Sequence, residues 1–254
     1  MVRPRDRPFG PPTRGRAGWD GPRRHGRGAV RVVRTAGRTA SRAGPGHTKE
    51  LVRMQATILA LGSRGDAQPY IALGVGLRRA GHRVRVLATS DFHQLIRSAE
   101  LDFFDMGGSM ETVARSMEGL LEGGNMLRIL ASMGPAAERM IGQAAARGLE
   151  AGQGSDVIIA GLGGLPVGCA LAEKLGIGFV PAYLYPFTPT SAFSSVLAPL
   201  PAVRLPGWAN RLSHRLAQQM IYQAWRVAET RARRQVLGLP PGSFWGPFAG
   251  LERG

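Results

Sequence analysis

The sequence has 254 residues and is 44% hydrophobic, which is enough apolar content for an ordinary globular core. Its formal charge of +16 is concentrated in residues 1–53, which carry +11 and leave only +5 for the remainder. Its one cysteine, Cys169, excludes an internal disulfide framework and has no His or Cys near it at metal-ligand spacing. No apolar stretch reaches the roughly 20 residues of a membrane-spanning helix. With no export signal apparent, we expect a reducing, cytoplasmic location.

Residues 1–53 are rich in Arg, Gly and Pro and poor in large apolar side chains. Such a segment buries too little surface to offset the entropy of ordering, so the sequence predicts a disordered tail. The abrupt change at Met54 suggests the hypothesis that this methionine is the true start of the protein. A nucleic-acid-binding arm is the alternative, because arginines attract phosphates without a folded structure. We favour a disordered upstream extension over a nucleic-acid-binding arm.

From Thr57 onward, short apolar runs alternate with helical patterns, as in βαβ units. The expected strands are residues 57–62, 84–88, 101–105, 157–160 and 177–183. The expected helices are residues 69–80, 92–99, two within 110–149, 165–175 and 208–237. Pro69 suits the first turn of the first helix, and Asp91 is expected to cap the second. The sequence predicts a Rossmann-like, doubly wound α/β domain over residues 54–254.

The last expected helix, residues 208–237, has an amphipathic pattern. One face carries Leu212, Leu216, Met220, Ala224 and Val227, and the other carries Arg211, Arg215, Arg226 and Arg233. An amphipathic helix of a globular protein usually turns its apolar face to the core, so we expect the leucine face to pack on the domain. Contact of the basic face with a membrane is the alternative.

The segment from Gly62 to Pro69 joins the first expected strand to the first expected helix. Ligands of open α/β sheets bind outside the carboxyl ends of the strands, and amides at a helix N-terminus favour anions. Neither the dinucleotide fingerprint nor the P-loop spacing is present, which counts against a nicotinamide-dependent oxidoreductase. Asp66 is the only carboxylate of the segment. It is either a helix cap or a base that accepts a proton from an attacking hydroxyl.

Several ordered segments carry a family resemblance. Residues 62–74 read GSRGDAQPYIALG and are followed by Leu77, Ala80, Gly81-His82 and Val84-Arg85-Val86; later come AEKLGI at 172–177, PFTPT at 186–190 with Phe193, and GLPP at 238–241. Together they resemble the N-terminal domain of glycosyltransferase family 28, over about residues 54–250. That family includes sterol glucosyltransferases and enzymes that glycosylate antibiotic aglycones.

The resemblance implies a GT-B architecture, in which two Rossmann-like domains face a cleft. The first binds the acceptor and the second binds UDP-sugar or another nucleotide-sugar, with inversion at the anomeric carbon and no obligatory metal or other cofactor. By the family motif Asp66 becomes a proposed general base, and Ser63, Arg64 and Gly65 lie beside the donor phosphates. The proline-rich segment then walls a pocket for a hydrophobic acceptor through Tyr185, Phe187, Pro189 and Phe193.

Family members continue into a donor domain, whereas this sequence stops at Gly254. We therefore expect the chain alone to hold the acceptor-binding half of a hexosyltransferase and to be inactive by itself. The alternative is a non-catalytic module that binds a hydrophobic ligand or pairs with a separate donor domain. No specific nucleic-acid partner is expected, and a peripheral membrane contact remains open.

Overall fold

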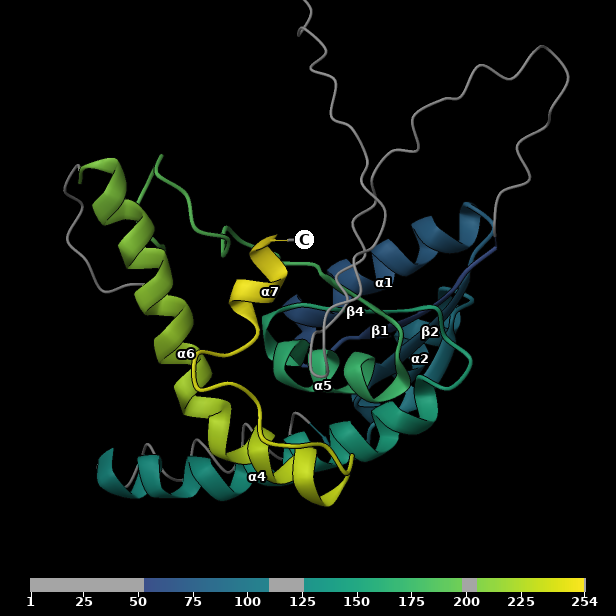
Figure 1. The fold of residues 1–254 in the computed structure, drawn as a ribbon. Helices are drawn as coiled ribbons and strands as arrows, with labels where there is room; N and C mark the ends of the chain where they lie inside the picture. The colour runs from purple at the N-terminus through teal and green to yellow at the C-terminus, as the bar shows by residue number, and fades with distance from the viewer. Residues whose placement is uncertain (1–52, 110–125, 198–204, 254) are drawn as a thin grey trace, which may run out of the picture.

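The computed structural model describes residues 53–109, 126–197 and 205–253, and Figure 1 shows its fold. Five strands form one parallel sheet in the order β3-β2-β1-β4-β5. They are β1 (Gln55–Leu59), β2 (Arg83–Ala88), β3 (Asp102–Asp105), β4 (Val157–Ala160) and β5 (Gly178–Pro181). The chain runs outward from β1 to β3 and then returns to the other side of β1, so the strand order reverses between β1 and β4. The predicted parallel α/β sheet is confirmed.

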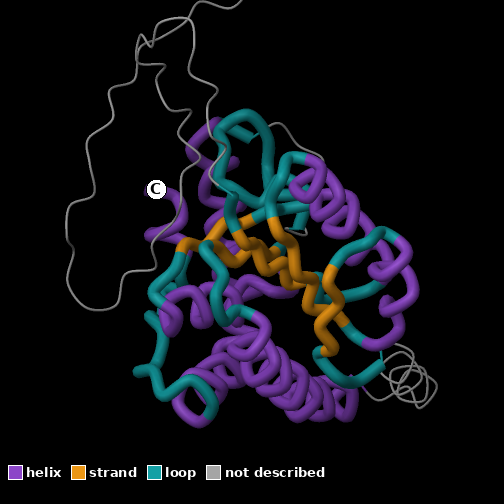
Figure 2. The backbone as a smooth tube through the Cα atoms, turned by 90° about the vertical axis from the view of Figure 1, so that its right-hand side faces the viewer, coloured by secondary structure: helices purple, strands orange, loops and turns teal. Residues whose placement is uncertain are grey.

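Helices cover both faces of this sheet, as the view in Figure 2 shows. They are α1 (Arg64–Arg79), α2 (His93–Ser98), α4 (Met126–Ala151), α5 (Leu165–Leu175), α6 (Gly207–Gln235) and α7 (Phe248–Arg253). Side chains of α1 and α2 share one buried cluster with the sheet, while α4, α5 and α6 share the other. This arrangement gives three layers.

Alternation of side chains along the strands supplies both clusters. Ile58 and Val86 face α1 and α2, whereas their neighbours Leu59 and Leu87 face α4 and α5. All four side chains are fully buried. Successive side chains of a strand point to opposite faces, so a sheet covered on both sides needs the continuous apolar runs seen in this sequence.

The start of α1 differs from its expected position. The helix begins at Arg64, five residues before the predicted start, with Ser63 at its N-cap and Asp66 in its first turn. Pro69 therefore lies inside the helix, where its missing N–H leaves the Gly65 carbonyl without a helical donor. Contacts between Ser63 and Asp66 start the helix early, so Asp66 stabilises the N-terminus from the third helical position and is not the cap itself.

Other boundaries agree more closely with the prediction. β4 and α5 have the expected bounds, and α5 ends before Gly176 as expected. β1 begins two residues before its expected range and ends three residues before the expected end, and β5 is shorter than its expected range. The expected cap of α2, Asp91, lies within a 3₁₀ turn of residues 90–92. α4 represents the second of the two helices expected within 110–149. The first of these, and the tail of residues 1–52, lie outside the described residues.

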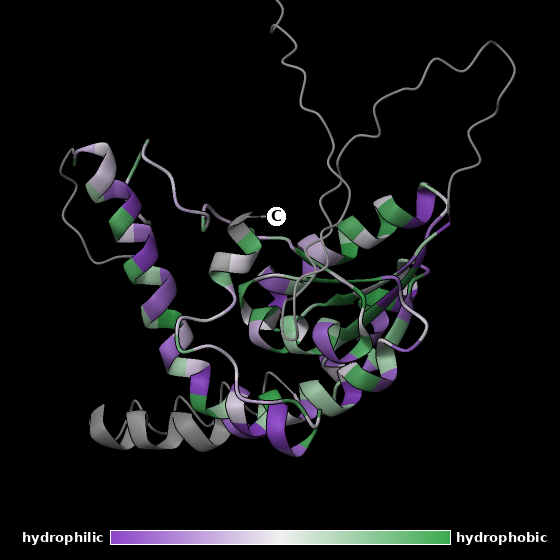
Figure 3. Cartoon of the chain, in the orientation of Figure 1, coloured by the Kyte–Doolittle hydropathy of each residue, from purple (hydrophilic) through white to green (hydrophobic). Residues whose placement is uncertain are grey.

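α6 exposes the leucine face that was expected to be buried, while Arg211 and Arg215 are exposed as expected. Leu212, Leu216 and Met220 are 46%, 54% and 61% exposed, and Arg233, which was expected to face solvent, is 5% exposed. The buried face is largely polar and includes Asn210, Ser213, His214, Gln218, Tyr222, Glu229 and Arg233. Figure 3 shows this mixture of hydrophobic and hydrophilic residues along α6, in contrast to the hydrophobic strands.

The partners of α6 explain this reversal. The Gln218 side-chain amide donates to the Phe187 carbonyl at 3.2 Å, and Asn210 donates to the Ser191 carbonyl at 3.0 Å. Arg233 donates to the Pro240 carbonyl at 2.7 Å and pairs with Glu173 of α5 at 2.8 Å. Besides packing on α4 and α5, α6 covers irregular backbone, whose buried carbonyls need donors that a leucine face cannot provide.

Candidate functional site

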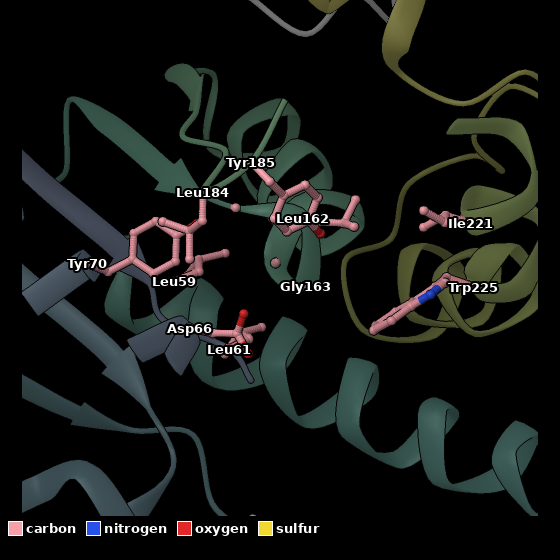
Figure 4. Close-up of a pocket in the computed structure, with 12 residues that line it drawn as sticks. Leu59, Leu61, Asp66, Tyr70, Leu162, Gly163, Leu184, Tyr185, Ile221 and Trp225 are labelled. Atoms are coloured by element: carbon pink, nitrogen blue, oxygen red, sulfur yellow. The ribbon is translucent and has the colours of Figure 1, made fainter. Parts of the chain in front are cut away.

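A small cavity lies outside the carboxyl ends of β1, β4 and β5, where the strand order reverses. Its volume is about 120 Å³, close to the size of an engineered cavity that accepts a benzene ring. It is lined by Leu59, Leu61, Asp66, Tyr70, Gly161, Leu162, Gly163, Gly164, Leu184, Tyr185, Ile221 and Trp225. Figure 4 shows Ile221 and Trp225 of α6 on the opposite side from Asp66, Tyr70 and Tyr185. This is the crevice where open α/β sheets bind ligands.

Asp66 is held at the first turn of α1. Its Oδ2 atom accepts hydrogen bonds from the Ser63 amide and the Ser63 hydroxyl, both at 2.9 Å. Within the described part of the chain Oδ1 accepts no hydrogen bond. Gly62 makes this position possible, because its φ of +137° favours glycine and an added Cβ would lie 2.4 Å from Oδ2. One oxygen therefore stabilises the helix while the other remains available to a ligand.

Tyr70 links α1 to the segment after β5. Its hydroxyl donates to the Ala182 carbonyl at 2.6 Å and passes close to the backbone of Gly161. A Cβ at residue 161 would lie 1.6 Å from the Tyr70 hydroxyl oxygen, so only glycine fits there. Burial, with a smaller contribution from the Asp66 charge, raises the pKa of Tyr70 to about 12. The phenol is thus neutral at physiological pH and remains a donor.

Tyr185 has a related environment on the same side of the cavity as Asp66 and Tyr70. Burial raises the pKa of its hydroxyl, and the negative charge of Asp66 raises it further. Asp66 thus acts on two phenols, because all three groups face the same space (Figure 4). The site combines one carboxylate, two neutral phenols and an apolar lining.

The predicted site residues divide between the cavity and its surroundings. Asp66 and Tyr185 line it. Ser63, Arg64 and Gly65 are exposed at the cap and first two positions of α1, so they border the site. Among the predicted acceptor-pocket residues, three do not line this cavity: Phe187, Pro189 and Phe193.

Phe187 and Phe193 have other surroundings. Phe187 is 2% exposed and packs edge-on against Tyr183 and Phe248. Phe193 is 44% exposed and contacts the ring of His214. Whether either binds an acceptor remains a prediction.

The sequence reasoning missed the α6 wall. Ile221 and Trp225 were not assigned to the site because the leucine stripe of α6 was expected to face the domain. Trp225 was the available signal, because a large aromatic side chain on the face away from the leucines indicates that this face is also covered. Within residues 53–109, 126–197 and 205–253, no group of three or more His, Cys, Asp or Glu side chains could hold a metal ion. In the same ranges no helix is long and apolar enough to cross a membrane.

Residues 56–194 match the N-terminal domain of glycosyltransferase family 28. This match covers more than half of the chain and includes β1 to β5. The chain belongs to glycosyltransferase family 28. Asp66 and Tyr185 lie within the family match, whereas Ile221 and Trp225 lie beyond it. The family domain therefore supplies the sheet side of the cavity, and the following helix closes its other side.

Relatives of this family-28 chain include several longer enzymes. It is 32% identical to a sterol 3-beta-glucosyltransferase of Debaryomyces hansenii, over 72% of this chain and 11% of that protein. It is also 32% identical to the O-mycaminosyltylonolide 6-deoxyallosyltransferase of Streptomyces fradiae, over 74% of this chain and 44% of that enzyme. The chain thus spans less than half the length of these relatives.

Among solved structures, the glycosyltransferase SsfS6 of Streptomyces sp. SF2575 is 20% identical and aligns with a TM-score of 0.46. This alignment covers 74% of the present chain and 47% of the SsfS6 chain.

Proposed function

We propose that this chain is the acceptor-binding half of an inverting hexosyltransferase and that Asp66 is its general base. The observation that carries the proposal is the difference in contacts between the two carboxylate oxygens of Asp66. Oδ2 is fixed by Ser63, while Oδ1 is available at the cavity that Tyr70 and Tyr185 border. A carboxylate so held can accept the proton of an acceptor hydroxyl as that oxygen attacks the anomeric carbon.

The nature of the cavity favours a hydrophobic acceptor. Leucines, glycine backbone and the Trp225 ring provide apolar contact, while the phenols provide polar groups at one end. A volume of about 120 Å³ suits one ring of a larger molecule, so the rest of the acceptor must extend out of the described cavity. A sterol or a polyketide-like aglycone has this shape, as the named substrates of the relatives suggest.

The donor side of the reaction is a separate part of the proposal. Ser63, Arg64 and Gly65 place helix N-terminal amides and one guanidinium beside Asp66, an arrangement that suits the phosphates of a nucleotide-sugar. We propose that a donor domain holds the nucleotide and that no metal or other cofactor is required. The chain by itself is then expected to bind acceptor without transferring sugar. Its expected location is the cytoplasm.

Acceptor binding is the first test. Quenching or a spectral shift of Trp225 fluorescence on titration with a sterol should be lost in Trp225→Phe and retained in the exposed control Trp245→Phe. Asp66→Asn should still bind the sterol, because the amide keeps an oxygen for Ser63. If neither a sterol nor a macrolide aglycone perturbs Trp225, the acceptor-binding proposal is wrong.

Transfer is the second test. In a chimera that joins this chain to the donor half of the Streptomyces fradiae relative, Asp66→Asn should lower kcat by about 10²- to 10⁴-fold with little change in acceptor binding. Arg64→Gln should instead raise KM for the nucleotide-sugar. A chimera that keeps full kcat after Asp66→Asn would leave the chain as a ligand-binding module, which is the alternative function. Sugar transfer by the chain without an added donor domain would show that the proposed acceptor-binding and donor-binding halves are not both needed.

A further inference from the structure

Two phenols border the cavity on the same side as Asp66, but their hydroxyl protons are used differently. The Tyr70 hydroxyl donates to the Ala182 carbonyl at 2.6 Å. The Tyr185 hydroxyl makes no hydrogen bond to any described residue, although its side chain is half-buried and lines the cavity. A phenol that loses contact with water usually finds a partner for its hydroxyl. Tyr185 is therefore available to donate to a molecule in the cavity.

The protonation of Tyr185 suits this role. Burial raises the pKa of its hydroxyl, and the Asp66 charge raises it further, so the phenol keeps its proton at physiological pH. Asp66 has the opposite character, because Oδ2 is held by Ser63 while Oδ1 accepts no hydrogen bond within the described chain. The cavity therefore presents one available donor, on the segment after β5, and one available acceptor, on α1.

The apolar wall opposite these two groups determines how a ring molecule lies in the cavity. Ile221 and Trp225 of α6 face Asp66 and Tyr185 across it (Figure 4). A ring that packs against this wall turns its polar substituent toward the carboxylate and the phenol, because a hydroxyl left against the apolar wall would lose its hydrogen bonds to water. The volume of about 120 Å³ holds one such ring.

We propose that Tyr185 donates a hydrogen bond to the acceptor oxygen and that, together with Asp66, it selects a hydroxyl as the group to be glycosylated. This inference rests on the proposed function, in which Asp66 Oδ1 accepts the proton of that hydroxyl. A hydroxyl has one proton and two lone pairs, so it can donate to Asp66 and accept from Tyr185 while one lone pair stays available. A ketone cannot donate and an ammonium group cannot accept, so each satisfies only one of the two residues.

The direction of attack follows from the same two contacts. The remaining lone pair of the acceptor oxygen forms the new bond to the anomeric carbon, and the hydroxyl proton goes to Asp66 Oδ1. The nucleoside diphosphate leaves with the electron pair of its bond to that carbon, and Tyr185 keeps its proton throughout. Because the proton and one lone pair of the oxygen are held, the attacking lone pair has a single direction, and such orientation lowers the barrier to reaction.

Three probes with the same ring separate the two contacts in the full chain, without a sugar donor. Cyclohexanol donates and accepts, cyclohexanone only accepts, and cyclohexylamine at about pH 7 is an ammonium ion that only donates. Binding is followed by the indole N–H signal of Trp225 in heteronuclear NMR spectra, identified by its loss in Trp225→Phe. Because the ring is common to the probes, differences among them report on the polar group.

Tyr185→Phe should weaken the binding of cyclohexanol and cyclohexanone by roughly three- to tenfold, because one neutral hydrogen bond is lost. The same variant should change cyclohexylamine binding by less than about twofold, which also shows that its cavity is intact. The matched control, Tyr70→Phe, removes a phenol whose proton is already donated to Ala182 and should affect the three probes alike. Asp66→Asn should weaken cyclohexylamine binding by roughly tenfold or more, because the ammonium ion loses its carboxylate.

Two results would overturn this inference and leave the proposed role of Asp66 intact. The first is an equal effect of Tyr185→Phe on all three probes, including no effect on any of them. The second is a loss specific to cyclohexanol and cyclohexanone in Tyr70→Phe, which would make Tyr70 the donor. Binding of none of the probes, or cyclohexylamine binding that does not depend on Asp66, would instead contradict the acceptor site of the proposed function.

Discussion

Around the ends of β1 and β4 the side chains pack so tightly that Gly161 cannot be replaced without a clash, whereas α6 adds buried hydrogen bonds and an ion pair to its apolar contacts. The first region is stabilised by apolar burial on both faces of a sheet. The second buries Arg233 and Glu229, whose charges are costly unless they are paired or neutralised. The two walls of one cavity should therefore respond to different perturbations.

The largest effect is expected from the ion pair that holds α6. Arg233→Ala should lower the free energy of unfolding by about 3 kcal/mol, because Glu173 loses its partner and the Pro240 carbonyl loses its donor. Urea denaturation measures the change. The control Arg231→Ala, which removes an exposed pair with Glu138, should cost less than about 1 kcal/mol. Equal losses in the two variants would mean that α6 is not anchored by its buried charge.

The packing around Gly161, at the ends of β1 and β4, should be sensitive to added side-chain volume instead. Gly161→Ala should lower the free energy of unfolding by about 2 kcal/mol, because its Cβ would overlap the Tyr70 hydroxyl. The double variant Gly161→Ala/Tyr70→Phe should be less destabilised than the sum of its single variants, because removing the hydroxyl removes part of the overlap. A double-mutant cycle by urea denaturation measures this coupling. Strict additivity would show that the tyrosine simply moves aside.

The buried carboxylate of α6 makes stability depend on pH. The Tyr222 hydroxyl oxygen lies 2.6 Å from Oε2 of Glu229 and 3.0 Å from the Ser243 carbonyl oxygen. The Tyr222 hydroxyl donates to Oε2 of Glu229, and the Ser243 carbonyl shares the same donor at the longer distance. Burial raises the pKa of Glu229, and the Tyr222 hydrogen bond and the Arg233 charge oppose this shift only in part.

Because the pKa is raised on folding, the folded state binds the proton more tightly than the unfolded chain. Stability should therefore fall as the pH rises from the ordinary glutamate pKa through the folded value, by no more than about 1.4 kcal/mol per pH unit. Glu229→Gln should remove that dependence, as urea denaturation from pH 4 to pH 8 would measure. The exposed control Glu150→Gln should keep it. A slope that persists in Glu229→Gln must come from other groups.

The smallest effect is expected on the exposed face of α6 that carries Leu212, Leu216 and Met220. Leu216→Gln should change the free energy of unfolding by less than about 0.5 kcal/mol, because the side chain is 54% exposed. Replacing Ala217, which is 3% exposed on the opposite face, by Gln should cost about 2 kcal/mol through overpacking. Thermal unfolding of this neighbouring pair gives a direct reading of which face α6 buries. A larger loss of stability in Leu216→Gln than in Ala217→Gln would show that α6 buries its leucine face, as the sequence predicted.

The sheet and the position of the site were accessible from the sequence because their signals are local. β4 and α5 were located by an apolar run bounded by glycines, and Asp66 by a motif that follows the first strand. The start of α1 was misplaced because Pro69 is a stronger sequence signal than the Ser63–Asp66 contact that begins the helix. Helix boundaries depend on such local hydrogen bonds, which single residues suggest only weakly.

By itself, the sequence determined the parallel α/β class, the family and the carboxylate at the end of β1. Only the tertiary structure decided which face of α6 is buried, and hence that Trp225 borders the cavity while Leu216 faces outward. Hydrophobic periodicity locates a helix but assumes that its partner surface is apolar. Here part of the surface that α6 covers is irregular backbone with carbonyls to satisfy, so hydrogen bonding as well as apolar packing sets the rotation of α6.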